Sequence, residues 1–564
     1  MTSLSLTSAV AGLALMLAAP QAGAGQAANV AAAVDQVMTA KGLGSPDAPG
    51  CAISVTKADD LLFAKAYGSA DLEHGAPFSL QTVSETGSVA KQFTAAEVLL
   101  LAEDGRLSLR DDVRKYLPEM PDYGEPITIY DLLHQISGVR EYSTLAALRG
   151  YPRFHKTLYD LDSAFALIAA QDKLNFRPGE RYEYSNSNYV LLTLVVERVS
   201  GMRAAEFGRR RLFEPLGMTS TQWRDDYRRI VKGRALAYRL TRSGYELFMP
   251  LENTFGHGAL LSTVGDLERW NRALVSGSLS PYVTRHMLEP GRLDSGETRS
   301  YGAGIVVGDY RGRRVYRHGG TTAGYTAQLW AFPDDRVSIA LLCNVRAGEM
   351  ADISARAADA ALGLSAMPAP SPDAAPPQAA GRPAFYRSDG GEMLALTTNG
   401  AATSVDLFTS NGPMRLTPAG SDRLAAVTPF GRLDLHRDGA NRVVVSFEDR
   451  EPLVFAAMPA AAPSGPPPLG LYVNASVGGY VLSKAKEGYR LDLADPRAAD
   501  PVGFRLEWLN GDVYRARIET RSGYIRDDMI VTLRLPRGRP ASLQMSSVAG
   551  LQAVDLLEFR RKGD

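Results

Sequence analysis

Cysteine and lysine are both scarce in this chain of 564 residues. There are two cysteines, Cys51 and Cys343, and 11 lysines beside 51 arginines. Two cysteines exclude a four-thiolate zinc site and a disulfide-dense scaffold, and they leave one disulfide or two buried thiols as alternatives. No lysine lies between Lys232 and Lys484, so any lysine chemistry must come from outside that span.

Net charge and long apolar segments are also missing. The 62 basic and 62 acidic residues give a formal charge of zero, which argues against a nucleic-acid partner or a polybasic membrane binder. Hydrophobic residues make up 45% and charged residues 22%, which excludes a wholly disordered chain, collagen and a polytopic membrane protein. We expect no membrane span, and the length predicts two to four domains.

The N-terminal segment predicts export. No charged side chain precedes Asp35, and an apolar run over residues 9–19 is followed by small residues at positions 22–24. This pattern is typical of a signal peptide, here over residues 1–24, although the basic residue that such signals carry before the apolar run is absent. We therefore expect a periplasmic or secreted protein.

Two stretches rich in proline and alanine divide the rest of the chain. Residues 367–383 read MPAPSPDAAPPQAAGRP, and residues 458–468 read MPAAAPSGPPP. Such segments act as semi-rigid linkers because they continue neither helix nor sheet. We therefore expect one large domain over residues 29–366 and two small ones over residues 384–457 and 469–564.

The large domain mixes two periodicities, whereas the small ones show one. In the large domain the pattern predicts a strand pair over residues 52–67, helices over 88–104 and 189–199, and strands over 315–318, 327–332 and 337–345. Strands at both ends with helices between them predict an α/β or α+β domain. The small domains alternate apolar and polar residues between Asn-Gly and Asp-Gly turns, which predicts an antiparallel β-barrel or sandwich in each.

Ser88 and Lys91 are the first candidates for chemistry. They stand in the segment SVAK at the start of a predicted helix, where residues three apart share a face. A lysine whose pKa is lowered by burial can take the proton of such a serine, and the serine N–H at a helix start can stabilise an oxyanion. Alone, the pattern more often reflects a surface serine and a solvated lysine. Ser54 and Lys57 repeat the spacing, but in a strand their side chains point to opposite faces.

Tyr184 and Asn186 form the second candidate group, in the segment YSN ahead of a helix. A phenol beside a lysine can move a proton between nucleophile and leaving group, and an amide can bind a substrate carbonyl. A loop tyrosine with a capping asparagine is the alternative.

The third candidate group is His318-Gly319-Gly320-Thr321 at the end of a predicted strand. Glycines allow a substrate to lie against the strand edge, and a following N–H can complete an oxyanion hole. The histidine would supply a donor or partial positive charge, and a hairpin with a surface histidine is the alternative.

Together, in this order and these settings, the three groups resemble the motifs of the serine β-lactamase and penicillin-binding-protein superfamily. The chain is most similar to the branch of class C β-lactamases, D-Ala-D-Ala carboxypeptidases, D-aminopeptidases and related esterases. That family has Ser-x-x-Lys on a helix, then Tyr-x-Asn, then Lys/His-x-Gly on a strand. The resemblance covers most of residues 45–350 and includes the segments ITIYDLLHQISGV, FRPGERYEYSNSNYVLLTLVVERVSG and GALLSTVGDLERW.

The resemblance implies a fold and a set of roles. The fold is a β-lactamase-like α/β (α+β) transpeptidase fold with an antiparallel central sheet, followed by two small antiparallel, lipocalin-like β-barrels. Ser88 would be acylated, Lys91 would be its base, and Tyr184 would relay protons. Asn186 would hold substrate and Lys91, and His318 takes the position of the third-motif base.

The remaining implied roles concern substrate binding. Gly319, Gly320 and Thr321 would line the bound substrate, and the N–H groups of Ser88 and Thr321 would form the oxyanion hole. The family implies neither a metal nor a cofactor, and a small peptide, amide or ester as substrate. Because Cys51 begins one outer strand and Cys343 ends its neighbour in this fold, we also expect these two residues to be bridged.

Two departures from the family pattern bear on the substrate. The third motif begins with His318 instead of the lysine that helps β-lactamases bind the substrate carboxylate, so we expect a peptidase, amidase or esterase ahead of a β-lactamase. The family segment Leu-Leu-x-His-Thr-Ser-Gly reads LLHQISG over residues 132–138, a change expected to affect packing behind the site. We expect a structural role for His134 and a position lining the site for His257.

The two small domains resemble the three-domain layout of D-stereospecific aminopeptidases, in which a barrel loop can restrict access to the active site. A ligand-binding role or a spacer role for the barrels is equally compatible with the sequence. The alternative from another class is a non-catalytic scaffold that binds peptidoglycan or another ligand. The presence of every catalytic residue type argues against such a scaffold.

Overall fold

The computed structural model describes most of the chain after residue 18. The described residues are 19–58, 60–151, 159–241, 243–346, 350–365, 383–389, 392–399, 402–408, 413–419, 422–428, 431–447, 450–495, 498, 502–519, 529–534, 541–547 and 557–562. The linker expected over residues 367–383 lies almost entirely outside them.

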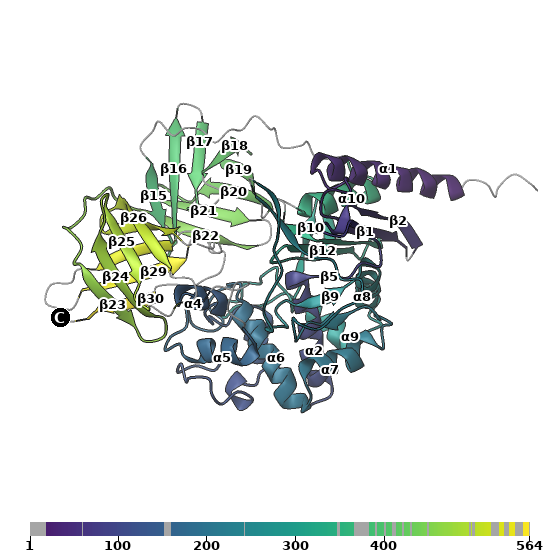
Figure 1. Ribbon diagram of the computed structural model, residues 1–564, viewed down its shortest axis with the longest axis horizontal. Coiled ribbons are helices and arrows are strands. Elements are labelled where there is room, and N and C mark those ends of the chain that lie inside the picture. The colour runs from purple at the N-terminus through teal and green to yellow at the C-terminus, as the bar shows by residue number, and fades with distance from the viewer. Residues whose placement is uncertain are drawn as a thin grey trace, which may run out of the picture.

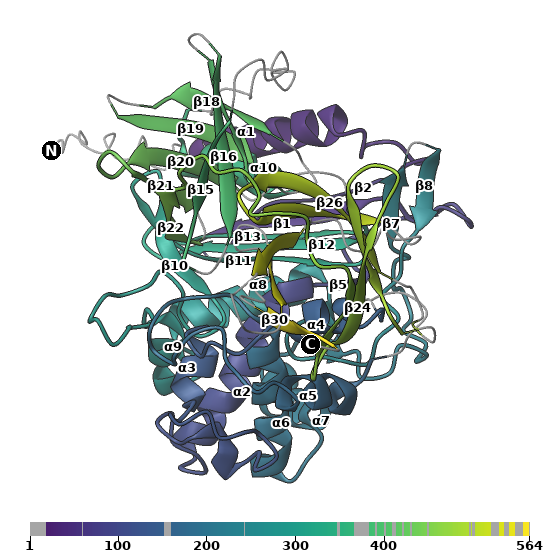
Figure 2. The same cartoon turned by 90° about the vertical axis from the view of Figure 1, so that its left-hand side faces the viewer.

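A six-stranded antiparallel sheet forms the centre of the large domain, as predicted (Figure 2). Its order is β10-β11-β12-β13-β1-β2, so both ends of the domain contribute neighbouring strands. The strands are β1 (Cys51–Lys57), β2 (Asp60–Tyr67), β10 (Val306–Tyr310), β11 (Arg313–Thr322), β12 (Tyr325–Phe332) and β13 (Val337–Cys343).

The two faces of this sheet bury different clusters of apolar side chains, because successive strand residues point to opposite faces. Ile53 and Val55 pack against α1 (Ala19–Ala40) and α10 (Ala351–Leu362), whereas Ala52 belongs to the larger cluster on the other face. Figure 2 shows α1 and α10 above the strands and the remaining helices below.

Most helices of the large domain lie on that second face. Among them α6 ends at Gly201, which adopts a left-handed conformation, and α8 begins at the capping hydroxyl of Thr263. The helices are α2 (Lys91–Glu103), α3 (Ile129–Leu133), α4 (Tyr142–Leu148), α5 (Leu161–Ala169), α6 (Asn186–Ser200), α7 (Ala204–Gly208), α8 (Val264–Ser276) and α9 (Pro281–Leu288), with short turns η1 (Gly87–Ala90), η2 (Val113–Lys115) and η3 (Arg209–Phe213).

Short strands complete the large domain in three small sheets. These are β3 (Ser69–Asp71) with β4 (Ala76–Pro77); β5 (Ser84–Glu85), β9 (Leu260–Ser262) and β6 (Gln222–Trp223); and β14 (Val345–Arg346), β7 (Tyr238–Thr241) and β8 (Gly244–Leu247). Among the described residues, no helix combines the length and apolar character needed to cross a membrane.

Two closed eight-stranded barrels follow, which confirms the expected β-barrels. The first contains β15 (Ala384–Arg387), β16 (Met393–Asn399), β17 (Ala402–Asp406), β18 (Met414–Pro418), β19 (Arg423–Thr428), β20 (Gly431–Arg437), β21 (Arg442–Phe447) and β22 (Arg450–Ala457). The second contains β23 (Gly470–Asn474), β24 (Gly478–Lys484), β25 (Tyr489–Leu493), β26 (Gly503–Asn510), β27 (Val513–Glu519), β28 (Met529–Arg534), β29 (Ser542–Ser547) and β30 (Leu557–Arg561).

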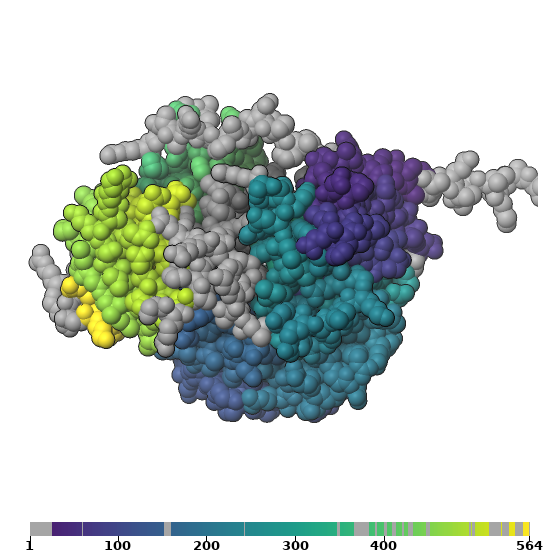
Figure 3. Space-filling view, viewed as in Figure 1, coloured from purple at the N-terminus to yellow at the C-terminus, as the bar shows by residue number. Residues whose placement is uncertain are grey.

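The second barrel contacts both of its neighbours. Its Arg515 forms an ion pair of 3.4 Å with Asp406 of the first barrel, and its interior packs against α4 of the large domain. Figure 3 shows this barrel at the opposite end of the molecule from α1. The described part of the chain therefore forms one continuous packed body.

Three elements differ in extent from the sequence expectation. The helix expected over residues 88–104 begins with the 3-10 turn η1, and α2 proper starts at Lys91. The helix α6 starts at Asn186 instead of residue 189, and β11 runs through both glycines to Thr322. Pairing of Gly319 with Gln328 of β12 keeps these glycines in the strand, where local sequence indicated a turn.

A disulfide joins Cys51 and Cys343, as expected. The two residues are directly paired across β1 and β13, with a Cα–Cα distance of 4.0 Å. Both side chains lie on the α1 and α10 face of the sheet.

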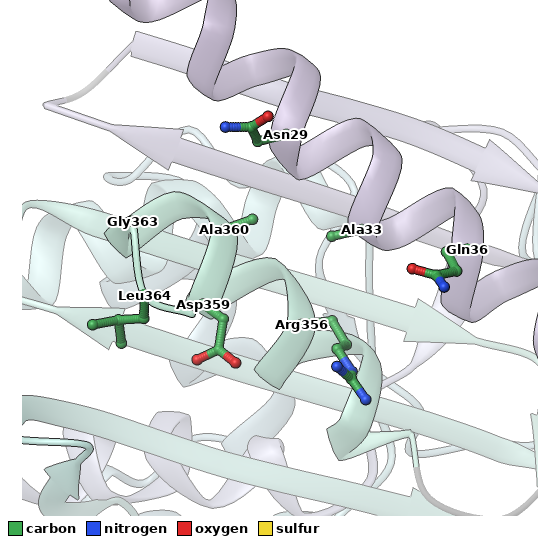
Figure 4. Close-up of a pocket in the computed structure, with 8 residues that line it drawn as sticks. All are labelled: Asn29, Ala33, Gln36, Arg356, Asp359, Ala360, Gly363 and Leu364. Carbon is green, nitrogen blue, oxygen red and sulfur yellow. The ribbon is translucent and has the colours of Figure 1, made fainter. Parts of the chain in front are cut away.

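A groove of about 310 Å³ lies on the same face, between α1 and α10. In Figure 4, Asn29, Ala33 and Gln36 of α1 lie across from Arg356 and the other lining residues of α10. His318 is paired with Leu329, whose side chain belongs to the cluster on the other face. The groove is therefore separated from the three sequence motifs by the sheet.

Candidate active site

Ser88 lies in η1, which packs directly against β11. Gly87 has a φ of 52°, and a Cβ on it would lie 2.5 Å from the N atom of Thr321. A Cβ on Gly320 would lie 2.7 Å from the N atom of Ser88. Glycine at both positions lets the turn and the strand touch, and the backbone N–H groups of Ser88 and Thr321 meet at this junction.

Lys91 lies one turn further along and is completely buried. Its Nζ donates hydrogen bonds to Ser88 Oγ at 3.1 Å, to Asn186 Oδ1 at 2.7 Å and to the His257 carbonyl oxygen at 2.7 Å. These three contacts hold the amine in one position beside the serine. A protonated amine donates to all three groups, and a neutral amine can donate to Asn186 and His257 while it accepts from the Ser88 hydroxyl. The structure thus brings together residues that are 166 positions apart.

Tyr184 lies close to both Lys91 and His318. The centroid of its ring is 4.7 Å from Lys91 Nζ and 6.3 Å from the centroid of the His318 ring. Asn186 is the first residue of α6, and the expected contact between its amide and Lys91 is present. Ser88 and Asn186 therefore bond the Lys91 amine, the Tyr184 ring lies beside it, and the His318 ring lies beside that of Tyr184.

His318 is buried, and both of its ring nitrogens are engaged. Nδ1 lies 2.6 Å from the Gly319 carbonyl oxygen, and Nε2 lies 3.1 Å from the Tyr301 hydroxyl. A carbonyl can only accept, so Nδ1 carries the proton and Nε2 accepts from Tyr301. Burial first, and then the nearby charge of Lys91, lower the pKa of His318 to about 3. Of the two roles expected for His318, a hydrogen-bond donor or a partial positive charge, the lowered pKa disfavours the charge.

The end of β11 offers an open edge beside Ser88. Pairing with β10 ends at Val306 and Arg317, while pairing with β12 continues to Thr322. Gly319 and Thr321 are exposed, and Gly320 between them is buried. An extended backbone can therefore align along this edge next to the serine.

Three further residues of the site escaped sequence analysis. Glu141 accepts hydrogen bonds from Asn186, Tyr142 contacts His257, and Tyr301 contacts His318. A signal for Tyr301 existed in its segment YGAG, because a Cβ on Gly304 would lie 2.6 Å from the Lys91 carbonyl oxygen. Glycine there marks a close backbone approach. Glu141 and Tyr142 carry no such local signal.

The segment over residues 132–138 contacts the residues next to the site. The His134 ring lies 4.1 Å from the Tyr130 ring between centroids, and burial lowers the pKa of His134 to about 4. This environment fits the structural role expected for His134. Gln135 has a φ of 61°, and its Oε1 accepts a hydrogen bond from the Ser185 N–H at 3.0 Å. Gln135 thus fixes the start of α6.

Groups able to hold a metal ion lie outside the motifs. Among the described residues, Asp71, Glu73 and His74 bring their ligand atoms within 4.8 Å of one another. Glu73 and His74 are exposed, and His74 forms an ion pair with Asp71. The three motifs therefore bring a nucleophile and a base together with no metal ligand set.

Known proteins are similar to this chain, chiefly over its large domain. The Beta-lactamase family matches residues 30–364, more than half of the chain. Penicillin-binding protein 4* of Bacillus subtilis is 30% identical over 302 residues, 50% of this chain and 66% of that protein. A D-aminopeptidase of Brucella anthropi is 28% identical over 333 residues, 56% of this chain and 60% of that protein. The chain thus covers less than two thirds of these relatives.

A solved structure supports the fold. The octameric penicillin-binding protein homologue from Pyrococcus abyssi has a TM-score of 0.54 at 24% identity, and the match covers 76% of this chain and 99% of that one. At this identity the match bears on fold alone. With the family match over residues 30–364, the chain belongs to the beta-lactamase family of serine hydrolases.

Proposed function

We propose that this protein hydrolyses peptides or amides that contain D-amino acids, through an acyl-enzyme on Ser88. The observation that carries this proposal is the position of Lys91 Nζ, 3.1 Å from Ser88 Oγ and fixed by Asn186 and His257. A buried amine held against a serine hydroxyl is the arrangement that nucleophilic catalysis requires. A scaffold protein would not need it.

The proposed reaction has two steps. In the first, the neutral amine of Lys91 takes the Ser88 proton while Oγ attacks the substrate carbonyl carbon. The N–H groups of Ser88 and Thr321 stabilise the oxyanion. The carbon–nitrogen bond then breaks, and a proton passes to the leaving amine with Tyr184 as the relay. In the second step Tyr184 takes a proton from a water molecule while the water oxygen attacks the ester carbonyl carbon. The bond to Ser88 Oγ then breaks, that proton is returned to Oγ, and the acid is released.

The substrate class rests on His318 and on the relatives. A neutral His318, with Nδ1–H donating to the Gly319 carbonyl, offers no positive charge to a substrate carboxylate. This favours an amide or peptide whose group near His318 is uncharged over a penicillin-like substrate. The D-aminopeptidase relative supports the D-amino-acid preference. The substrate backbone would lie along Gly319, Gly320 and Thr321, with a carbonyl group of the substrate near the Asn186 amide.

We further propose that the protein works outside the cytoplasm. The Cys51–Cys343 disulfide supports this, because such bonds persist in oxidising compartments. N-terminal sequencing of protein purified after expression should find a start near residue 25, and an N-terminus at Met1 on protein from the periplasm would contradict the signal peptide.

A turnover panel tests the substrate class. D-amino-acid amides, D-Ala-D-Ala peptides, p-nitrophenyl esters and nitrocefin are offered to the wild type, with Ser88→Ala as the blank. We expect the highest kcat/KM for a D-amino-acid amide or peptide. Preferred hydrolysis of nitrocefin would instead identify a β-lactamase, and wild-type activity equal to the blank on all four would contradict hydrolysis by Ser88.

A further inference from the structure

The helix α4 links the second barrel to the Lys91 network. It spans Tyr142–Leu148, and Glu141 caps its N-terminus by accepting a hydrogen bond from the Ser143 N–H. Its first residues therefore lie in the candidate site, while its last turn belongs to the cluster inside the second barrel. Figure 1 shows α4 between α6 and the strands β23 and β30.

Glu141 joins the starts of two helices. It is completely buried, and it also accepts hydrogen bonds from Asn186 N–H at 2.5 Å and from Asn186 Nδ2 at 3.4 Å. A carboxylate at two helix N-termini is stabilised by both helix dipoles. Because a carboxylate only accepts, the Asn186 amide must turn its Nδ2 toward Glu141 and its Oδ1 toward Lys91. Glu141 and the donating Lys91 amine therefore together fix the orientation of the Asn186 amide.

Tyr142, the first residue of α4, supports a second acceptor. Its hydroxyl lies 3.1 Å from His257 Nε2, and the rings pack edge to face. The His257 carbonyl oxygen accepts the 2.7 Å hydrogen bond from Lys91. Two adjacent residues of one helix start thus contact the two groups, Asn186 and His257, that hold the amine beside Ser88.

The last turn of α4 packs into the interior of the second barrel. Leu145 and Leu148 are buried in the same cluster as the inward-facing side chains of that barrel. The Tyr480 hydroxyl of β24 donates a hydrogen bond of 2.5 Å to the Leu148 carbonyl oxygen. Ser476, just before β24, contacts Gln171 of the large domain at 3.4 Å. The interior of the barrel is therefore completed by side chains of the large domain.

We propose that the second barrel is a positioning domain for Lys91, and that Glu141 is the residue through which it acts. The proposal rests on the proposed function of Ser88 and Lys91. The barrel seats the last turn of α4, and α4 in turn places Glu141 and Tyr142 against the two groups that hold the amine. A small tilt of α4 would rotate or shift Asn186, and misplacement by about 1 Å costs catalysis about a hundredfold.

This arrangement also distinguishes the barrel from a ligand-binding one. A lipocalin-like barrel would need an empty interior, whereas Leu145 and Leu148 enter the cluster that Tyr472, Tyr480 and Phe504 fill. The contact with α4 thus gives this barrel a mechanical role in the site.

The test measures acylation of the full-length protein by a fluorophosphonate. The limiting rate at saturating probe is separated from the apparent affinity, because a positioning role changes the rate and leaves the affinity nearly constant. We expect Glu141→Gln to lower the limiting rate about a hundredfold, because a glutamine can also donate and the Asn186 orientation then loses one of the two groups that fix it. The affinity should stay within about twofold.

Matched pairs at the barrel isolate the contact with α4. Tyr480→Phe removes the bond to Leu148, and its control Tyr472→Phe removes a hydroxyl of an equally buried tyrosine that bonds to the Pro468 carbonyl just before β23, away from α4. We expect Tyr480→Phe to slow acylation about threefold to tenfold and Tyr472→Phe to leave it within about twofold of wild type. Leu148→Ala and Leu491→Ala repeat the comparison for apolar side chains of the same cluster.

The outcomes separate the two proposals. If wild-type protein is labelled at Ser88, and Tyr480→Phe and Tyr472→Phe are both labelled at the wild-type rate or slowed equally, the barrel has no positioning role. A normal limiting rate in folded Glu141→Gln would remove Glu141 from the account. If wild-type protein is not labelled at Ser88, the proposed function itself fails. Thermal unfolding of each variant confirms that the protein compared is folded, and the tyrosine pair decides where Glu141→Gln or Leu148→Ala does not fold.

Discussion

The Tyr301 hydroxyl donates a hydrogen bond of 3.1 Å to Nε2 of His318. The opposite ring nitrogen of His318 donates to the Gly319 carbonyl oxygen within its own strand. The Gly319 contact places a proton on Nδ1, and because burial lowers the pKa of His318 to about 3, the neutral ring carries none on Nε2. A neutral polar ring therefore occupies the third-motif position at which β-lactamases have a lysine.

His318 should therefore stay neutral over the whole working pH range. Its pKa is lowered to about 3, mainly by burial, so no titration is expected between pH 5 and pH 9. Nitrogen NMR of histidine-labelled protein, with the signal assigned by His318→Asn, should show an unchanged Nδ1–H tautomer in this window. A midpoint between pH 6 and pH 7 would contradict the neutral assignment.

Gly320 should not tolerate a side chain. A Cβ there would lie 2.7 Å from the Ser88 N atom, so Gly320→Ala should push β11 away from η1 and slow acylation of Ser88 at least about a hundredfold. Gly308→Ala is the control, because its nearest neighbour would be the Val306 side chain at 3.9 Å. Equal acylation rates in the two variants would argue against the contact between η1 and β11 as a requirement of the site.

Glu268 should make stability depend on pH in a known direction. Burial raises its pKa from about 4.5 to about 7, so between these values the folded state binds more protons than the unfolded state. Its contribution to stability is therefore present at pH 4.5 and is lost as the pH rises through 7. Glu268→Gln should gain about 2 kcal/mol relative to wild type on going from pH 5 to pH 8.

Denaturant unfolding at pH 5 and pH 8 measures this difference. The substitution keeps the size of the side chain and its ability to bond the Thr56 hydroxyl, so packing changes should cancel between the two pH values. The same free-energy difference between variant and wild type at both would show that Glu268 ionises normally.

The Cys51–Cys343 disulfide should stabilise the fold without acting on the site. It closes a loop of 292 residues on the sheet face of α1 and α10. Replacing both cysteines by serine should cost about 2–4 kcal/mol of unfolding free energy and leave the Ser88 acylation rate within about twofold of wild type. Thiol titration of unfolded, unreduced protein should find no thiol, and two would contradict the bridge.

Local sequence patterns predicted the strands that pair with their neighbours in the sequence. The alternation over residues 52–67 and within the two small domains predicted strands that pair with their sequence neighbours, and the structure has the strand pair β1–β2 and two closed barrels. The extension of β11 was not predictable, because pairing with β12 overrides the two glycines that locally indicate a turn.

The candidate site divides in the same way. Ser88 and Lys91 are three residues apart, so helical spacing alone brings them together. Glu141 contacts Asn186, which lies 45 positions further along the chain. Tyr301 contacts His318 but belongs to none of the three motifs. Nothing in the sequence around Glu141 distinguishes it from a solvated surface carboxylate. Its burial depends on α4 and α6 meeting, which is a tertiary event.

The central claim is that Ser88 is the nucleophile and Lys91 its base. Peptide mass spectrometry after incubation with a fluorophosphonate tests it most directly. We predict one adduct, on the peptide that contains Ser88, and its absence from Ser88→Ala. Lys91→Arg should be labelled at least about a thousandfold more slowly, because arginine cannot give up its proton to act as a base. An adduct that persists in Ser88→Ala, or wild-type labelling of Lys91→Arg, would contradict the account.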